Sequence, residues 1–318
     1  MENKFSIIVC TFNRLDYLKK CINALLALDF PEYKILIVND GSTNETKNFL
    51  DALNEKRITV IHNETNKGLS RSRNIGIANS TSEFLAFTDD DCQVDKNWLA
   101  ELSKSFDKQK VDFVIGQTFY ISASYKGYFP ERLVSNIDAR WPMGCNIAYR
   151  KKVFEICGGF DDFFYKYNNE DSEMAIRATS KNFSFARCKT AIVNHQAMNW
   201  NAKALLRSTR NAAVWPLLKK KYPEYFQVFG SPVLLGTIIN PKDYLFLLIL
   251  PVVVPVLFIR YLAHGKRDVK IFFIKWPVYL ILRRYYIYKE AISNKIFLFF
   301  GQLSDLGEPR RDGIREYL

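Results

Sequence analysis

Residues 5–41 read FSIIVCTFNRLDYLKKCINALLALDFPEYKILIVNDG, and this stretch predicts the type of fold at the amino-terminal end of the chain. Phe5–Cys10 is a β-branched, apolar run of the kind found in strands that are buried on both faces. Apolar residues recur at helical spacing over Leu15–Leu28, and Lys34–Val38 predicts a second buried strand. A strand, a helix and a strand in this order form the unit from which parallel sheets are built.

The alternation of apolar runs with helical spacing continues along the chain, with a less regular aromatic stretch at Phe119–Trp141. Further helices are expected at Thr43–Leu53, Leu69–Asn79, Trp98–Phe106 and Glu170–Ser180. Further strands are expected at Ile58–Ile61, Phe84–Phe87, Val111–Gly116, Gly144–Tyr149 and Ala191–Val193. We therefore expect an α/β fold with a doubly wound, mostly parallel, Rossmann-like sheet.

Polar loops follow three of the predicted strands, at Thr11–Arg14, Asn39–Ser42 and Thr88–Asp91. The carboxyl ends of parallel strands lie at the same edge of a sheet, and open α/β sheets bind their ligands at that edge. The three loops are therefore expected to converge on one site.

The third loop, Thr88-Asp89-Asp90-Asp91, places three carboxylates side by side. Burying unpaired carboxylates is costly because like charges repel and lose their hydration. A hard divalent cation, whose coordination shell nucleotide phosphates complete, removes that cost. The alternative is a solvated acidic turn or a helix cap.

Two other segments are compatible with nucleotide binding. Asp40 precedes a glycine, which is typical of a simple turn, although its carboxylate could also accept a hydrogen bond from a nucleobase. Lys67–Asn74 opens a helix with glycine and three cations, an arrangement that the helix dipole disfavours unless an anion such as a diphosphate binds there. A solvated basic helix face is the alternative.

Two candidates lie nearer the end of this region. Asn169-Glu170-Asp171 begins a predicted helix, where acids often serve as caps but can also supply a general base. His195 follows the short predicted strand Ala191–Val193. A lone histidine is often a satisfied polar residue, and the alternative is an imidazole ligand that completes a carboxylate metal site.

Taken together, these segments resemble glycosyltransferase family 2, whose members have the A-type nucleotide-diphospho-sugar transferase fold. The resemblance covers roughly residues 5–195. The motifs that carry it, in order, are SIIVCTFNR (6–14), VNDGS (38–42), GLSRSRN (68–74), TDDD (88–91), GCNIAYRK (144–151), GGFDDFF (158–164), NNED (168–171) and His195.

The resemblance implies a role for each matching position. Asp171 would be the catalytic base, and Asp91 with His195 would bind Mg²⁺ or Mn²⁺. The residues implied in binding the donor, a nucleotide-diphosphate sugar, are Thr11, Asn13, Arg14, Asp40, Arg71, Arg73, Asn74, Asp89 and Asp90. The residues implied near the donor sugar and at the turn toward the acceptor are Gly144, Cys145, Asn146, Gly158 and Gly159.

The implied reaction is the inverting transfer of one sugar to a hydroxyl of a glycan or lipid-linked acceptor in cell-surface polysaccharide synthesis, with a UDP-sugar as the expected donor. Polymer-making relatives carry a Gln-x-x-Arg-Trp motif, whereas Gln196–Trp200 lacks the arginine, which favours single-sugar addition. The alternative is a membrane-bound scaffold or binding protein with a degenerate transferase site.

The last third of the chain differs from the rest in composition. The net charge of the 318 residues is +12, and residues 201–318 hold 19 basic but only 8 acidic residues among apolar and aromatic ones. No nucleic-acid-binding motif accompanies this charge, so we expect a membrane surface and no nucleic acid. We expect a catalytic domain at 1–198 and a helical, membrane-associated region at 199–318.

The apolar run Tyr244–Ile259 contains two prolines and is short for a membrane crossing. We therefore expect helices in the cytoplasmic interface, with one or two true spans or a buried helical layer as alternatives. No signal peptide is recognisable, and no cysteine pair has C-x-x-C spacing, which predicts free thiols and a catalytic part in the cytosol. The cysteines are Cys10, Cys21, Cys92, Cys145, Cys157 and Cys188.

Overall fold

The computed structural model describes residues 3–121, 136–139, 141–196, 206, 208–222, 250–263 and 269–296. These residues belong to two compact units. The first unit contains 3–121, 136–139 and 141–196, and the second contains 206, 208–222, 250–263 and 269–296. The domain boundary expected at 198/199 lies outside the described residues and stays a prediction.

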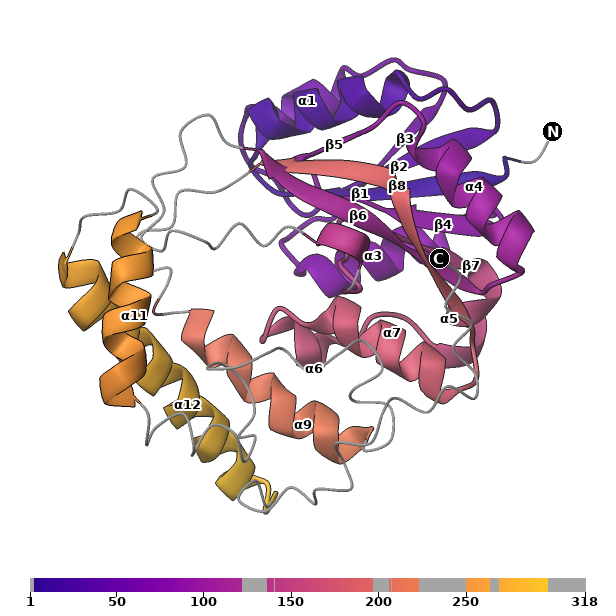
Figure 1. Ribbon diagram of the computed structural model, residues 1–318. Coiled ribbons are helices and arrows are strands. Elements are labelled where there is room, and N and C mark those ends of the chain that lie inside the picture. Colours follow the sequence, from indigo (N-terminus) through magenta and orange to yellow (C-terminus); the bar gives the residue numbers. More distant parts are fainter. Residues whose placement is uncertain are drawn as a thin grey trace. The chain divides into compact units, whose positions relative to one another are not determined.

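Within the described part of the first unit, eight strands form one sheet in the order β3-β2-β1-β4-β7-β6-β8-β5 (Figure 1). The strands are β1 Phe5–Thr11, β2 Tyr33–Asn39, β3 Ile58–His62, β4 Phe84–Phe87, β5 Cys92–Val94, β6 Phe113–Ile121, β7 Ile147–Arg150 and β8 Phe185–Gln196. The pairs β1–β2, β2–β3, β1–β4 and β6–β8 are parallel, whereas β4–β7, β6–β7 and β5–β8 are antiparallel. The expected α/β class with a mostly parallel sheet is confirmed.

The carboxyl half of the sheet departs from the expected strands most clearly at β5 and β8. The sequence did not predict β5, because three residues are too few to show a periodic pattern. Strand β8 is longer than the expected Ala191–Val193, because it begins at Phe185 and bulges where its pairing with β6 shifts after Cys188. The exposed residues Lys189 and Thr190 lie in this bulge and interrupt the apolar pattern.

Helices cover both faces of the sheet, as a doubly wound fold requires. Helices α1 (Leu15–Leu26) and α4 (Trp98–Gln109) share one apolar core with Ile7 and Val9 of β1. Helix α3 (Leu69–Ala78) packs on the opposite face, where a Cβ at Gly76 would lie 2.6 Å from the Ile8 side chain (Figure 1). The other helical segments of this unit are α2 Glu45–Asp51, η1 Ile137–Ala139, α5 Lys151–Cys157, α6 Asp162–Tyr165 and α7 Glu170–Ser180.

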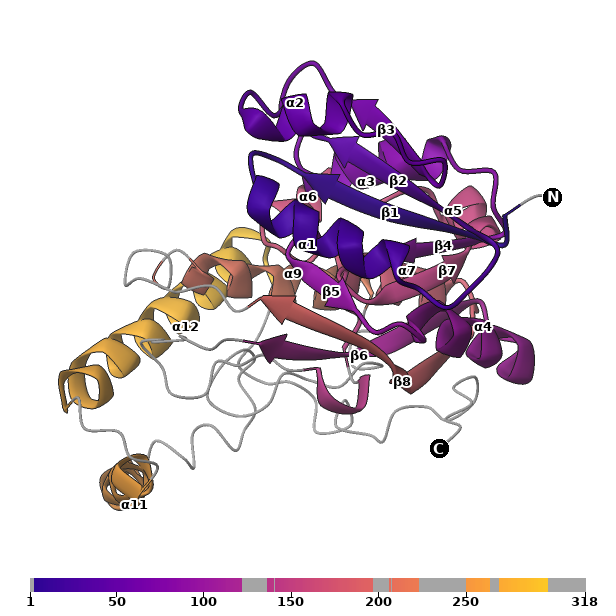
Figure 2. The same cartoon turned by 90° about the horizontal axis from the view of Figure 1, so that it is seen from above.

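The register of the parallel strands places their carboxyl ends together (Figure 2). Thr11 at the end of β1 pairs with Asn39 at the end of β2, so the first two polar loops start at the same level. Strand β4 ends earlier, because its last residue Phe87 pairs with Ile8 of β1. The three aspartates that follow β4 therefore run beside the end of β1.

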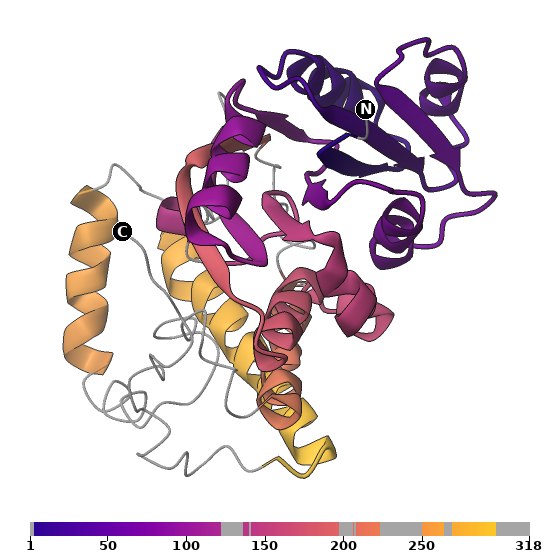
Figure 3. The same cartoon turned by 90° about the vertical axis from the view of Figure 1, so that its right-hand side faces the viewer.

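The second unit is helical in its described part. Its elements are η2 Thr209–Ala213, α9 Val214–Lys221, α11 Leu250–Ala263, the π-helical η3 Ile271–Lys275 and α12 Trp276–Ser293. Helix α12 packs against η2 and α9 around a small core of Ala212, Ile287 and Ala291 (Figure 3). None of the helices in the described ranges combines the length and the apolar character that a membrane crossing requires.

Candidate active site

The first polar loop holds the carboxylates that follow β4. The Thr11 hydroxyl donates to Asp90 Oδ2 over 2.8 Å. Arg14 contacts two aspartates at once, with Nη1 2.8 Å from Asp90 Oδ1 and Nη2 2.6 Å from Asp91 Oδ2. The structure therefore brings the first and third polar loops together, as expected. Hydrogen bonds and ion pairs between their own side chains join them. The part of Thr11 and Arg14 in nucleotide binding stays a prediction.

Asp90 is the most buried carboxylate of the triplet. Burial raises its pKa to about 7, although Arg14 and the Thr11 hydroxyl favour its ionised form. Its neighbours Asp89 and Asp91 add repulsion in the same direction. The negative electrostatic potential of the three aspartates thus favours the binding of a cation at this loop.

Arg73 on α3 connects the aspartate triplet with the acidic pair at the start of α7. Its Nη2 lies 2.8 Å from Asp89 Oδ1, and its Nη1 lies 2.9 Å from Glu170 Oε1. Burial by itself would lower the pKa of Arg73, but the carboxylates of Asp89 and Glu170 raise it above the usual arginine value. The guanidinium is therefore a permanent positive charge inside the site.

Asp171 lies beside this arginine. The backbone N–H of Gly144 donates to its Oδ2 over 2.8 Å, and that of Ser172 donates to its Oδ1 over 2.7 Å. Gly144 packs directly on Arg73, since a Cβ there would lie 2.5 Å from Nη2. Burial raises the pKa of Asp171, while Arg73 and the two N–H groups oppose the rise. The carboxylate thus faces the same charged centre as Asp89 rather than the far side of the sheet.

Glu170 was not assigned a role from the sequence, yet it is a buried member of the site. Burial and the neighbouring Asp171 raise its pKa to about 7, against the attraction of Arg73. Its Oε2 atom has no hydrogen-bond partner among the described residues. The sequence signal was available in the acidic first turn of α7, but an exposed helix cap has the same pattern.

His195 at the end of β8 is oriented by its neighbours. Its Nδ1 lies 2.9 Å from the Gln196 carbonyl oxygen, so the Nδ1–H tautomer satisfies that contact and leaves Nε2 as the free ligand atom. Nε2 lies 3.4 Å from Asp91 Oδ1. The ring of Tyr120, a residue that the sequence did not single out, stacks on the imidazole at 4.6 Å.

Asp89, Asp91 and His195 form a cluster in which each residue offers one ligand atom, and these atoms lie within 4.8 Å of one another. Carboxylate oxygens with one imidazole suit Mg²⁺ or Mn²⁺. Asp91 Oδ1 and His195 Nε2 lie 3.4 Å apart, a separation at which both atoms can contact one cation. The residues therefore fit the expected metal.

Asp40 is occupied by contacts that fix the start of α3. Its carboxylate accepts hydrogen bonds from the backbone N–H groups of Lys67 and Gly68, at 2.8 and 2.9 Å, and from the Asn63 side chain at 2.9 Å. These hydrogen bonds satisfy the buried carboxylate of Asp40. Recognition of a nucleobase by this residue stays a prediction.

Asn13 links the first two polar loops. It adopts a left-handed φ of 55°, its N–H donates to the Ser42 hydroxyl, and its Oδ1 accepts from the Thr43 N–H. The two loops are therefore held together, and a contact of Asn13 with the nucleotide stays a prediction.

Arg71 and Asn74 on α3 point toward the later glycine-rich loop. Arg71 is exposed and forms an ion pair with Asp162 of α6. The Asn74 amide makes two hydrogen bonds to the Phe160 backbone, and a Cβ at Gly159 would lie 2.3 Å from its Oδ1. These contacts do not involve the aspartate triplet, and the roles of Arg71 and Asn74 along a ribose or diphosphate stay predictions.

Cys145 and Asn146 follow Gly144 but are buried below the surface of the site. The Asn146 amide accepts from the Trp98 indole N–H and donates to the carbonyls of Gln117 and Ala191. Asn146 therefore braces the sheet, and its approach to the donor sugar stays a prediction.

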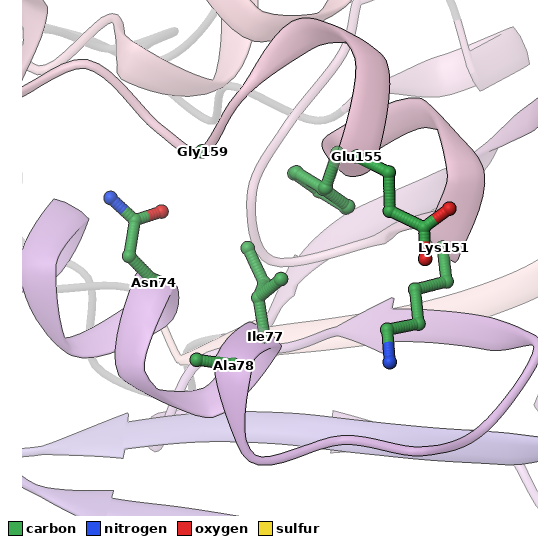
Figure 4. A pocket seen from close by; sticks show the side chains of 7 residues that line it. Asn74, Ile77, Ala78, Lys151, Glu155 and Gly159 are labelled. Carbon is green, nitrogen blue, oxygen red and sulfur yellow. The ribbon is translucent and has the colours of Figure 1, made fainter.

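A cavity of about 330 Å³ lies beside α3, and no residue of the aspartate triplet lines it (Figure 4). Its lining residues are Asn74, Ile77, Ala78, Lys151, Phe154, Glu155 and Gly159. Lys151 and Glu155 come from α5, and Ile77 and Ala78 come from α3. Asn74 and Gly159 are predicted site residues, whereas the predicted metal ligands and catalytic base are not among the lining residues.

Comparison with known proteins shows which family this chain matches. The model of Glycosyl transferase family 2 matches residues 6–171. Glycosyltransferase GlyA of Streptococcus pneumoniae serotype 4 is 25% identical over 166 residues, which are 52% of this chain and 22% of GlyA. The aligned stretches cover only 44% of GlyG from the same organism and 56% of the glucosyl-dolichyl phosphate glucuronosyltransferase of Haloferax volcanii.

Solved structures share the fold. The mannosyltransferase PcManGT from Pyrobaculum calidifontis, in complex with GDP-Man and Mn²⁺, has a TM-score of 0.60 with 16% identity and covers 93% of this chain and 88% of its own. S. aureus TarS 1–349 in complex with UDP-GlcNAc has a TM-score of 0.54 with 21% identity and covers 71% of each chain. The family match spans more than half of this sequence and includes every motif from the first strand to Asp171, and the chain therefore belongs to glycosyl transferase family 2.

Proposed function

We propose that this chain is a metal-dependent, inverting glycosyltransferase that moves one sugar from a nucleotide-diphosphate donor to an acceptor hydroxyl. The observation that carries the proposal is the connection through Arg73 between Asp89 in the metal-ligand cluster and the acidic pair that contains Asp171. Family relatives named as glycosyltransferases support the class of reaction. TarS with UDP-GlcNAc supports a UDP-sugar, and PcManGT with GDP-Man and Mn²⁺ supports a metal.

The side chains of the site suit this reaction. Asp171 accepts the proton of the acceptor hydroxyl, and its raised pKa makes it a stronger base than an ordinary aspartate. The N–H groups of Gly144 and Ser172 hold its carboxylate in a fixed direction. Asp89, Asp91 and His195 would hold the cation, which when bound neutralises charge on the departing nucleotide diphosphate. One base suffices when the hydroxyl attacks opposite the leaving group and inverts the anomeric carbon.

Replacing Asp91 by alanine is expected to abolish Mn²⁺-dependent binding of the donor, because it removes a cluster ligand and frees Arg14 from one of its partners. Titration calorimetry with UDP-GlcNAc, other UDP-sugars and GDP-Man, each with and without Mn²⁺, measures the effect and identifies the donor. Hydrolysis of the bound donor gives a second reading.

Asp107→Asn is the matched control, since Asp107 is an exposed aspartate that pairs only with Lys4 and Ser103 among the described contacts. Equal metal-dependent donor binding in wild type and Asp91→Ala would contradict the proposed site. If neither protein showed metal-dependent donor binding, the alternative of a scaffold with a degenerate site would be favoured.

We further propose that the acceptor is a glycan or lipid-linked glycan at the cytoplasmic face of the membrane. Helix α11 exposes Val252, Val256 and Ile259 at helical spacing, and α12 exposes Val278 and Ile281. Basic residues outnumber acidic ones in this part of the sequence. Aliphatic side chains beside lysines and arginines suit the surface of an anionic bilayer.

The double variant Val256→Asp/Ile259→Asp is expected to bind phosphatidylglycerol-containing vesicles at least ~10-fold more weakly, because each aliphatic side chain contributes about 1.5–3 kcal/mol on leaving water. Co-sedimentation with vesicles measures this. Ile156→Asp changes a similarly exposed isoleucine of the first unit and should bind as wild type does. Unchanged binding of the double variant would refute the contribution of α11.

A further inference from the structure

A second group of metal-ligating side chains lies next to the carboxylate cluster. Cys92, Cys145 and His195 each offer one ligand atom, and these atoms lie within 4.8 Å of one another. Both thiols are free, and the two residues are 1% and 3% exposed. The proposed transfer reaction uses neither thiol.

The sheet fixes the positions of these side chains. Cys92 opens β5 and is the direct register partner of His195 on β8. On the other side of β8, Tyr120 of β6 pairs with His195 and stacks on its imidazole. Cys145 lies two residues before β7, with its Sγ 3.9 Å from the Thr118 hydroxyl. Paired strands thus hold Cys92 and His195, and the turn that leads into β7 holds Cys145, on elements whose backbone is fixed.

Asp91 is placed to supply a fourth ligand atom. Its Oδ1 lies 3.4 Å from His195 Nε2 and 3.9 Å from Cys92 Sγ, while Arg14 occupies its other oxygen, Oδ2. In a tetrahedral zinc site, with bonds of about 2.0–2.3 Å, the ligand atoms lie about 3.3–3.8 Å apart. The two distances from Asp91 Oδ1 lie close to this range, whereas the ligand atoms of Cys92, Cys145 and His195, which lie within 4.8 Å of one another, must move closer together to reach it.

The chemistry of the ligands differs from that of the neighbouring cluster. Thiolate sulfur is a soft ligand that selects Zn²⁺ and related ions, whereas carboxylate oxygens select Mg²⁺ and Mn²⁺. The contact of His195 Nδ1 with the Gln196 carbonyl leaves Nε2 as the ligand atom in both cases. His195 is therefore a ligand shared by two adjacent sites, one that prefers soft cations and one that prefers hard cations.

We propose that the chain has a binding site for a soft divalent cation, Zn²⁺ or Cd²⁺, whose ligands are Cys92 Sγ, Cys145 Sγ, His195 Nε2 and Asp91 Oδ1. On coordination each thiol forms a sulfur–metal bond and releases its proton to solvent. The site shares Asp91 and His195 with the cluster for the hard cation, so the two ions exclude each other. Binding of a soft cation then blocks donor binding, a consequence that rests on the proposed function, whereas the binding itself does not.

Cadmium binding to the purified chain tests the site directly, because sulfur–cadmium charge transfer absorbs in the ultraviolet. Wild type is expected to bind one Cd²⁺ with this absorption, and Co²⁺ is expected to give the visible spectrum of a tetrahedral thiolate site. Cys92→Ser and Cys145→Ser should each lose most of the cadmium band, and circular dichroism checks that they fold. Cys157→Ser is the control, since Cys157 lies at the end of α5 outside the cluster. Absence of the band from wild type, or its retention in both cluster variants, overturns the proposal.

Competition separates this inference from the proposed function. In wild type and Cys157→Ser, Zn²⁺ should abolish Mn²⁺-dependent donor binding, whereas Cys145→Ser should need at least ~10-fold more Zn²⁺ for the same loss. Cadmium binding without any metal-dependent donor binding would leave the soft-cation site standing and count against the proposed transferase function. Metal-dependent donor binding by a protein that shows no cadmium band would overturn the soft-cation site and leave the proposed transferase function standing.

Discussion

Replacing Asp171 by asparagine is expected to lower the rate of sugar transfer by ~10²–10⁴-fold, the contribution typical of a positioned general base. Asparagine has nearly the same shape and can still accept a backbone hydrogen bond from Gly144 or Ser172, but it cannot take the proton of the acceptor hydroxyl. Donor binding should change little, because the ligand cluster of Asp89, Asp91 and His195 is intact. Steady-state transfer rates with saturating donor, together with donor titrations, measure the two effects separately.

The pH dependence of wild type provides a further reading of the same group. Burial raises the pKa of Asp171, and the base must be ionised to act, so the transfer rate should fall as pH drops through this raised value. Asp107→Asn, at an exposed position, should transfer at the wild-type rate. Wild-type rates in Asp171→Asn would show that another group accepts the proton.

Replacing Arg73 by methionine is expected to destabilise the fold by about 3–5 kcal/mol at neutral pH, because two carboxylates lose their buried partner. Glu170 is nearly as buried as Arg73 and its Oε2 already has no hydrogen-bond partner among the described residues, so the cost falls mainly on it. Denaturant unfolding followed by circular dichroism measures the free-energy difference.

The sign of the pH effect follows from the raised pKa of Glu170, about 7 in the folded chain against an ordinary value of 4.5. The protonated Glu170 carboxyl contributes to the stability of the fold. This contribution is fully present below pH 4.5 and is lost as pH rises through 7, where the buried carboxyl ionises. Without Arg73 this pKa rises further, so the destabilisation should shrink as pH falls. The double variant Arg73→Met/Glu170→Gln should recover part of the lost stability, whereas Arg71→Met, at an exposed neighbouring position, should cost little. Equal losses in the single and double variants would exclude the buried pair as the cause.

Local sequence patterns determined much of the amino-terminal sheet. The strand expected at Phe84–Phe87 and the helix expected at Glu170–Ser180 have those bounds in the structure. Runs of buried apolar residues reveal such elements because each run follows the period of its own element. The rule that ligands meet the carboxyl ends of parallel strands then placed Thr11, Arg14 and the aspartates in one region, where hydrogen bonds now join them.

The sequence by itself thus determined the class of fold, the order of the motifs and the edge of the sheet at which the site lies. Only the tertiary structure decided which charges meet: Arg73 pairs with Asp89 and with Glu170, which lies 97 positions after Arg73 in the chain, while Arg71 pairs at the surface with Asp162. It also decided that Cys92 and Cys145 gather around His195. The physical reason is that periodicity reports the burial of one element at a time, whereas these contacts depend on strand order and on the antiparallel pairing of β5 with β8, which no local pattern encodes.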